Sequence, residues 1–248
     1  MSEAAIFPLT SLDCRHVQVD WAFAEEEAAR IAAFWSDFQV RSPASFNGRI
    51  FLLHKARFEG DAFTGQCLEA DFAAFMAWRA FGFPGRAMRN FFAMAALRAA
   101  DGAFLLGEMS PDTANPGKIY FAAGTPDPED RLADGTIDLA GSVLRELQEE
   151  TGLRPDEVRV TPGWTCLDMA PRLAFMREVQ VDMPADQARA LMLARMKSLP
   201  EQELVDIHIV RGPADIDETR MPPFQVAYLR WAFGGKVVDA RHKAGHDG

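Results

Sequence analysis

The sequence lacks most of the features that mark secreted, metal-clustered or membrane-spanning proteins. Its three cysteines are widely spaced and form no CxxC or Cys/His pattern, so we expect buried thiols in a reducing compartment rather than disulfides or a zinc site. No apolar run is long enough to cross a bilayer, and the first residues, MSEAAIFPL, lack the basic and apolar regions of a signal peptide. These absences predict a cytoplasmic protein without a membrane partner.

Basic residues are also scarce. The chain has 26 Lys and Arg against 36 Asp and Glu, a formal net charge of -10, and no basic block. A surface that follows a nucleic-acid backbone needs clustered positive charge, so we expect no nucleic-acid partner. A small nucleotide is compatible with this charge, because a metal ion and a few local basic side chains can bind its phosphates. No P-loop, no GxGxxG motif before a helix and no Ser/His/Asp arrangement occurs, which leaves serine nucleophiles and Rossmann-type cofactors without support.

Apolar patterns predict helices and strands along the whole chain, with no internal repeat. In the first third we expect a strand at 14–21, a helix at 24–38, a strand pair within 49–72 and a helix at 71–82. Beyond it we expect a hairpin at 91–109, strands at 119–121, 157–169, 172–183 and 204–211, and helices at 138–153, 186–199 and 222–233. This order suits an α+β fold, with 1–86 as an N-terminal α/β extension, 87–240 as the core domain and 241–248 as a disordered tail.

The most informative stretch is the predicted helix at 138–153, DLAGSVLRELQEETGL. Leu139, Val143, Leu144 and Leu147 recur at helical spacing and form its expected buried stripe. Asp138 lies in the first turn, where a negative charge suits the helix dipole. Gly152 follows the last periodic residue, as expected for a left-handed cap.

The opposite face of this helix is acidic. Glu146, Glu149 and Glu150 fall at positions i, i+3 and i+4, so their carboxylates repel one another. A hard divalent cation such as Mg²⁺ or Mn²⁺ would reverse that interaction. Arg145 lies four residues before Glu149 and is expected to hold it through a charged hydrogen bond. A bare ExxEE pattern is more often a solvated surface, so the surrounding residues decide its interpretation.

The continuous string RELQEETGL, residues 145–153, resembles the second half of the Nudix box, REUxEExGU with U apolar, without a mismatch. The resemblance implies a Nudix-type α/β/α sandwich with a mixed sheet. It also implies a hydrolase whose substrates are nucleoside diphosphates linked to another group. Glu146, Glu149 and Glu150 would then be the catalytic ligands of Mg²⁺ or Mn²⁺, and Arg145 would orient them.

The first half of the box departs from the family pattern. The position of its Glu holds Ile137, the position of its Gly holds Arg131, and Asp138 comes one residue late. The matching glycine is Gly124 in YFAAGTPDPED, followed by a longer loop. By resemblance we assign Gly124 to the surroundings of the metal and phosphates, and Lys118 with it to substrate binding.

A narrower resemblance concerns the substrate. The segment NPGKIYFAAGTPDPED and the stretches FNGRIFLL and FAAFMAWRAFGFP are similar to bacterial relatives of Nudix enzymes that split UDP-glucose and UDP-galactose. This favours a nucleotide sugar such as UDP-glucose. Hydrolysis of coenzyme A or a dinucleotide stays open, as does a catalytically weak metabolite sensor, which the broken first half of the box would suit. Many members of the family are dimers, so a homodimer is one expected assembly.

Further side chains are candidates for the site. Nudix enzymes often use a carboxylate on a downstream loop as the general base, and four acids there are available: Glu203, Asp206, Asp215 and Asp217. In the first third, Asn47, Trp78 and Arg79 are candidates to face a ligand. Packing for Trp78 and exposure to solvent for Arg79 are the simpler interpretations.

Overall fold

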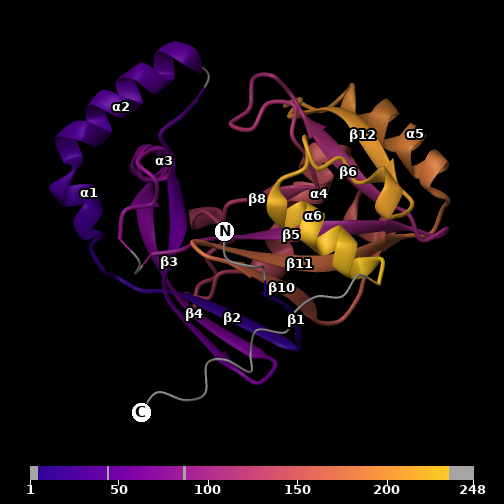
Figure 1. Cartoon of the computed structure of the whole chain (residues 1–248), viewed down its shortest axis with the longest axis horizontal. Coiled ribbons are helices and arrows are strands. Elements are labelled where there is room, and N and C mark those ends of the chain that lie inside the picture. The colour runs from indigo at the N-terminus through magenta and orange to yellow at the C-terminus, as the bar shows by residue number, and fades with distance from the viewer. Residues whose placement is uncertain (1–4, 44, 86–87, 235–248) are drawn as a thin grey trace.

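The computed structural model describes residues 5–43, 45–85 and 88–234 as two sheets with six α-helices (Figure 1). The predicted tail at 241–248 lies outside the described residues. The larger sheet contains β1 (Ala5–Leu9), β5 (Asn90–Ala99), β6 (Phe104–Met109), β7 (Ile119–Tyr120), β8 (Ala123–Gly124), β9 (Val158–Val160), β10 (Trp164–Met169), β11 (Arg172–Val181) and β12 (Leu204–Val210). The smaller sheet contains β2 (Ser11–His16), β3 (Arg49–Glu59) and β4 (Ala62–Asp71).

The helices follow the predicted periodic segments, except that the helix predicted at 24–38 is divided into two at Glu27. They are α1 (Ala22–Glu26), α2 (Ala28–Arg41), α3 (Phe72–Ala80), α4 (Leu139–Thr151), α5 (Ala185–Met196) and α6 (Pro223–Ala232), with short 3-10 turns at Pro128–Asp130, Pro155–Glu157 and Pro213–Asp215. Within the described ranges, no helix has the length and apolar character needed to cross a membrane.

The larger sheet is the middle layer of a sandwich. Its main strand order is β1-β10-β11-β5-β6-β12, with β5 and β11 parallel and its other strand pairs antiparallel. Side chains alternate along β5: Leu97 belongs to the buried cluster of Val143 in α4 and Met192 in α5, whereas Met94 belongs to the cluster of Leu229 in α6. The expected α+β sandwich with a mixed sheet is therefore confirmed.

This sheet opens between β5 and β6. The two strands pair next to their turn, where Arg98 lies opposite Phe104. Further along, β8 pairs with β5, with Gly124 opposite Ala93, and β7 pairs with β6, with Tyr120 opposite Gly107. The short strands β7 and β8 thus carry the segment before α4 into the middle of the sheet.

The smaller sheet and the helices α1 to α3 form a second layer group beside the main sheet (Figure 1). Their shared core contains Trp21, Ile31, Leu68 and the fully buried Trp78. The turn predicted between β3 and β4 is present, and α3 starts directly after Asp71 as expected. Within this group, α3 lies near the first residues of β5 and β11 in the larger sheet, because all three elements line one groove.

The strands differ from the expected ones in three places. The strand predicted at 14–21 occupies Ser11–His16, and the alternating residues after it lie outside any strand, with Val19 exposed. β1 was not predicted. It contains Pro8, which its position at the edge of the sheet, paired only with β10, tolerates. The strand predicted at 157–169 is divided into β9 and β10 by a turn in which Gly163 has a positive φ of 76°.

Candidate active site

Helix α4 is fixed at both ends and along one side. The Asp138 carboxylate caps its start by accepting a hydrogen bond from the Gly141 N–H at 2.9 Å. Gly152 ends the helix in the left-handed conformation, with φ of 74°. The buried side chains of Val143 and Leu147 hold the helix against the sheet, so its acidic face has a defined position.

Glu150 is the most deeply buried of the three glutamates, with 5% of its surface exposed. Its Oε1 accepts a hydrogen bond from the Ala123 N–H at 3.1 Å, while its buried Oε2 has no hydrogen-bond partner among the described residues. Burial raises the pKa of this carboxyl well above its ordinary value, and the charges of Glu203, Glu146 and Glu149 act in the same direction. An anionic oxygen left without a partner in the interior is unfavourable, and a hard divalent cation would satisfy it. The residues therefore fit a metal ion.

Glu146 lies one turn earlier, against β8. Burial raises its pKa to about 7, although the neighbouring Arg145 opposes that shift. Arg145 Nη1 lies 3.0 Å from Glu146 Oε1. A Cβ added to Gly124 would lie only 2.3 Å from the same oxygen, so only glycine leaves room for the carboxylate in this position. The glycine that the sequence matched to the box thus contacts the acidic face.

Arg145 links α4 to the loop in front of it. Its Nη1 donates to Glu149 Oε2 at 3.2 Å, which is the predicted hydrogen bond, and its Nη2 donates to Asp130 Oδ1 at 2.9 Å. Asp130 is 5% exposed, and its Oδ2 accepts the Asp127 N–H at 3.1 Å. Sequence reasoning missed Asp130, because nothing in PDPED distinguishes a buried partner of Arg145 from a loop acid. The loop inserted before the helix therefore helps to hold the orienting arginine.

The four candidate bases differ in their surroundings. Glu203 is exposed as a whole residue, but the protein around its carboxyl raises its pKa through burial and through the charges of Glu201 and Glu149. Its charge in turn raises the pKa values of Glu146 and Glu150, so it lies within electrostatic reach of both.

The other three candidates are held by partners of their own. Asp206 accepts from Arg189 Nη2 at 2.7 Å, Asp215 accepts the Arg211 N–H at 2.7 Å, and Asp217 accepts from Arg220 Nε at 2.9 Å. Among the four, Glu203 is the candidate whose charge acts on Glu146 and Glu150.

A second acidic group lies on β6 and β12. Among the described residues, Glu108, Asp206 and His208 form a set whose ligand atoms all lie within 4.8 Å of one another. Glu108 Oε2 is already 2.6 Å from His208 Nε2 and 3.1 Å from Arg220 Nη1, and Asp206 is bound by Arg189. We interpret this set as an ion-pair network, because arginines already neutralise both carboxylates.

A groove of about 900 Å³ lies on the α6 side of the sheet, and none of the three α4 glutamates is among the residues that line it. Ala123 and Gly124, whose backbone contacts Glu150 and Glu146, form part of its wall. Tyr120 and Lys118 also line it, and Lys118 Nζ donates to the Thr219 carbonyl at 3.2 Å. Both residues assigned to substrate binding from the sequence, Gly124 and Lys118, therefore face one groove.

The N-terminal segment contributes to the groove through α3. Arg79 lines it, whereas Trp78 is fully buried and donates its Nε1–H to the Pro84 carbonyl at 2.9 Å. Asn47 is used locally, because its Oδ1 accepts the Ala73 N–H at 2.8 Å. Of the three candidates named in the first third of the chain, only Arg79 reaches the groove.

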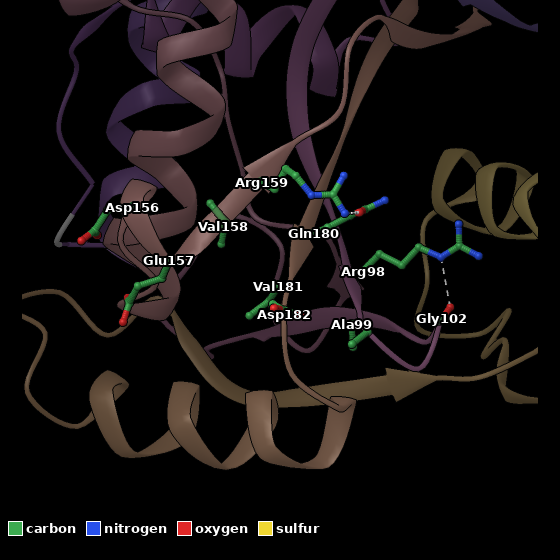
Figure 2. A pocket seen from close by; sticks show the side chains of 11 residues that line it. Arg98, Ala99, Gly102, Asp156, Glu157, Val158, Arg159, Gln180, Val181 and Asp182 are labelled. Atoms are coloured by element: carbon green, nitrogen blue, oxygen red, sulfur yellow. Dashed lines mark hydrogen bonds between the residues drawn. The ribbon is translucent and has the colours of Figure 1, made fainter.

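Another cavity, of about 660 Å³, lies at the opposite end of β5 and β11 (Figure 2). Its charged lining includes Arg98, Asp156 and Arg159, and the Arg98 Nε–H donates to the Gly102 carbonyl at 3.2 Å. The residues that line this cavity do not include the α4 glutamates. The groove is the hollow that adjoins the catalytic candidates, because Ala123 and Gly124 in its wall contact Glu150 and Glu146.

Comparison with known proteins identifies a family for most of the second part of the chain. A family model described as the NUDIX domain matches residues 88–231. No curated protein sequence matches the chain.

Solved structures with a similar fold include three proteins of low sequence identity. A Nudix hydrolase from M. smegmatis, RenU, is 15% identical, with 58% of this chain and 83% of that chain covered and a TM-score of 0.40. A C. elegans Ap4A hydrolase is 16% identical, with 50% and 81% covered and a TM-score of 0.36. A MutT protein from Methanosarcina mazei Go1 is 16% identical, with 58% and 92% covered and a TM-score of 0.36.

Proposed function

We propose that this chain, which belongs to the NUDIX domain family, uses Mg²⁺ or Mn²⁺ to hydrolyse the diphosphate bond of a nucleoside diphosphate linked to another group. The observation that carries the proposal is the buried Glu150 beside the groove. One of its oxygens has no hydrogen-bond partner among the described residues, and Glu146 lies one turn away with a raised pKa. Such an arrangement suits a metal ion better than a structural carboxylate.

Each side chain has a role in this proposal. Glu146, Glu149 and Glu150 hold the metal, and Arg145 positions Glu149 from its anchor on Asp130. When bound, the metal neutralises phosphate charge, orients the reacting groups and lowers the pKa of water. Glu203 accepts the proton of the attacking water as general base. Gly124 keeps the wall of the groove close to Glu146.

The substrate proposed is a nucleotide sugar such as UDP-glucose. The support is the similarity of the N-terminal stretches and of NPGKIYFAAGTPDPED to enzymes of that kind. The groove, at about 900 Å³, is within the size range of small-molecule sites.

We further propose residues 1–86 as an extension and 87–240 as the hydrolase domain, which the family match beginning at residue 88 supports. A cytoplasmic homodimer is the assembly proposed.

Phosphate release from a substrate panel tests the function. Nucleotide sugars, dinucleotides, nucleoside triphosphates and coenzyme A are incubated with the protein and a phosphatase, with and without Mg²⁺. Turnover of UDP-sugars only with metal is expected. Metal-dependent turnover of coenzyme A or a dinucleotide would keep the hydrolase and replace the substrate. Turnover of no compound, together with a thermal shift by one of them, would instead identify a sensor.

Replacing Gly124 by Ala is expected to lower turnover between about tenfold and 100-fold, because a misplaced catalytic group has effects of this size. The added Cβ would lie 2.3 Å from Glu146 Oε1 and displace that carboxylate. The fold should persist, because the clash is with the mobile end of a side chain. kcat/KM on the best panel substrate is the measurement.

Gly212→Ala is the matched control for this substitution. Gly212 has an extended φ of -173°, and a Cβ added there has no neighbour within 4 Å. We expect its turnover to equal that of the wild type. Equal turnover in the Gly124→Ala and Gly212→Ala variants would contradict the assignment of Gly124.

A further inference from the structure

Two arginines from distant parts of the chain meet in the groove without carboxylate partners. Arg79 lies in the last turn of α3 and Arg172 is the first residue of β11, and both line the groove. Arg79 Nη1 lies 3.6 Å from the sulfur of Met76, and the Arg172 guanidinium lies 4.8 Å from the ring centroid of Phe83. Neither arginine forms an ion pair in the part of the chain that the structure describes. The chain has more acidic than basic residues, so two arginines without an acidic partner in one groove are unusual.

The pairing of β5 and β11 places Arg172 at the groove. Arg172 lies opposite Asn90 in the parallel register, and side chains of equal parity on these strands share the face covered by α6. Arg89 fixes the backbone there, because its Nη2 donates to the Arg172 carbonyl at 3.0 Å. Asn90 also lines the groove, and its buried Oδ1 has no hydrogen-bond partner among the described residues. The start of these strands therefore presents a fixed cation and a polar amide to any ligand.

The charged groups in this region act on one another and on Tyr120. Burial and then the charge of Arg172 lower the pKa of Arg79, and burial lowers that of Arg172. Burial raises the pKa of Tyr120 to about 12. The charges of Glu150 and Glu203 also raise this pKa, whereas the charge of Arg79 lowers it. Arg79 thus lies within electrostatic reach of Tyr120, on which the charge of the buried Glu150 also acts. An anion between the arginines would offset their repulsion.

We propose that Arg79 and Arg172 form an anion subsite that binds a phosphate group of the substrate, so that α3 of the N-terminal segment completes the substrate site. The inference rests on the proposed function for its choice of phosphate. Arginine matches phosphate oxygens with paired, charge-assisted hydrogen bonds, and a partly buried position strengthens them. The phosphate comes either from the diphosphate itself or from a further phosphate group on the substrate.

Calorimetric titration with inorganic pyrophosphate in the presence of EDTA tests the subsite without any metal or turnover. The wild type is expected to bind saturably, and Arg79→Gln and Arg172→Gln are each expected to weaken binding about tenfold or more, the usual effect of losing a charged hydrogen bond. Unchanged affinity in both variants would overturn the subsite. Because no hydrolysis occurs, the result is independent of whether the hydrolase proposal succeeds.

Arg177→Gln is the matched control for these variants. Arg177 lies on the same strand as Arg172 and also stacks on an aromatic ring, with its guanidinium 4.8 Å from the centroid of Trp164. It is on the opposite face of β11 and does not line the groove. We expect its pyrophosphate affinity to equal that of the wild type, and a loss as large as that of Arg172→Gln would overturn the subsite.

Lysine variants separate binding from folding. Arg79→Lys and Arg172→Lys keep the charge but lose the planar pair of donors, so they are expected to bind pyrophosphate with an affinity between wild type and the Gln variants. Pyrophosphate should raise the Tm most in the wild type, less in the Lys variants and least in the Gln variants. Gln variants with a lower Tm but an unchanged ligand-induced shift would show a structural role and overturn the proposal.

The source of the phosphate is read from steady-state kinetics with Mg²⁺. If the arginines bind the diphosphate, Arg79→Gln raises KM about tenfold for every panel substrate while kcat changes little. If they bind a further phosphate, KM rises only for substrates that carry one, such as coenzyme A. Either pattern supports the subsite, and an unchanged KM for all substrates opposes it.

Discussion

Replacing Glu150 by Gln is expected to lower metal-dependent turnover by at least about 1,000-fold, because metal assistance is worth several kcal/mol of transition-state stabilisation. A neutral amide cannot replace the anionic Oε2 that the fold leaves without a partner, although the Gln oxygen can still accept the Ala123 N–H. Glu149→Gln is expected to act in the same direction. Steady-state rates at saturating Mg²⁺ are the measurement, with the exposed Glu129→Gln as control. A Glu150→Gln enzyme with near wild-type turnover would remove α4 from the active site.

The same substitution is expected to leave metal-free stability unchanged or higher at pH 8. The folded protein raises the pKa of Glu150 above its ordinary value of 4.5, so it binds this proton more tightly than the unfolded chain does. The protonated Glu150 carboxyl therefore contributes its full share of the free energy of unfolding below pH 4.5, and this contribution is lost as the pH rises towards the folded pKa. Glu150→Gln removes this loss, so its Tm in EDTA should exceed that of the wild type at pH 8 and approach it near pH 4.5. A lower Tm at pH 8 would show that the carboxylate stabilises the fold instead.

Replacing Glu203 by Gln is expected to lower kcat at least about 100-fold while KM changes little, since general-base catalysis contributes factors of this size. Glu203 is the downstream acid whose charge acts on both Glu146 and Glu150. Rates are measured across pH at saturating metal and substrate.

Three variants serve as controls for Glu203→Gln. Glu201→Gln changes an exposed neighbour. Asp215→Asn and Asp217→Asn change acids that already bind local partners, with Asp217 accepting from both Thr219 and Arg220. We expect all three to keep kcat within about threefold of the wild type, well below the effect of losing a general base. A Glu203→Gln enzyme in that same range would exclude Glu203 as the base.

The sequence by itself determined the parts of this protein that depend on neighbours along the chain. Helical spacing predicted α4, its Gly152 cap and the Arg145 hydrogen bond to Glu149, because these contacts lie within one or two turns. It also predicted the buried Leu139, Val143 and Leu147, whereas Leu144 is only half-buried. The hairpin at Asp101 and Gly102 was predicted for the same reason. The RELQEETGL string indicated the family because its residues are continuous in the chain.

The tertiary structure decided what depends on contacts between distant segments. It buried Asp130 against Arg145 and left Asp215 and Asp217 with local partners, and in it the charge of Glu203 raises the pKa of Glu150. It also paired the start of β11 with that of β5 and placed α3 at the same groove, so that Arg79 and Arg172, from different elements, both line it. The apolar periodicity of the sequence indicates which face of a helix or strand is buried, but it does not indicate which other element covers that face. Partners far apart in the chain are therefore fixed only when the whole core packs.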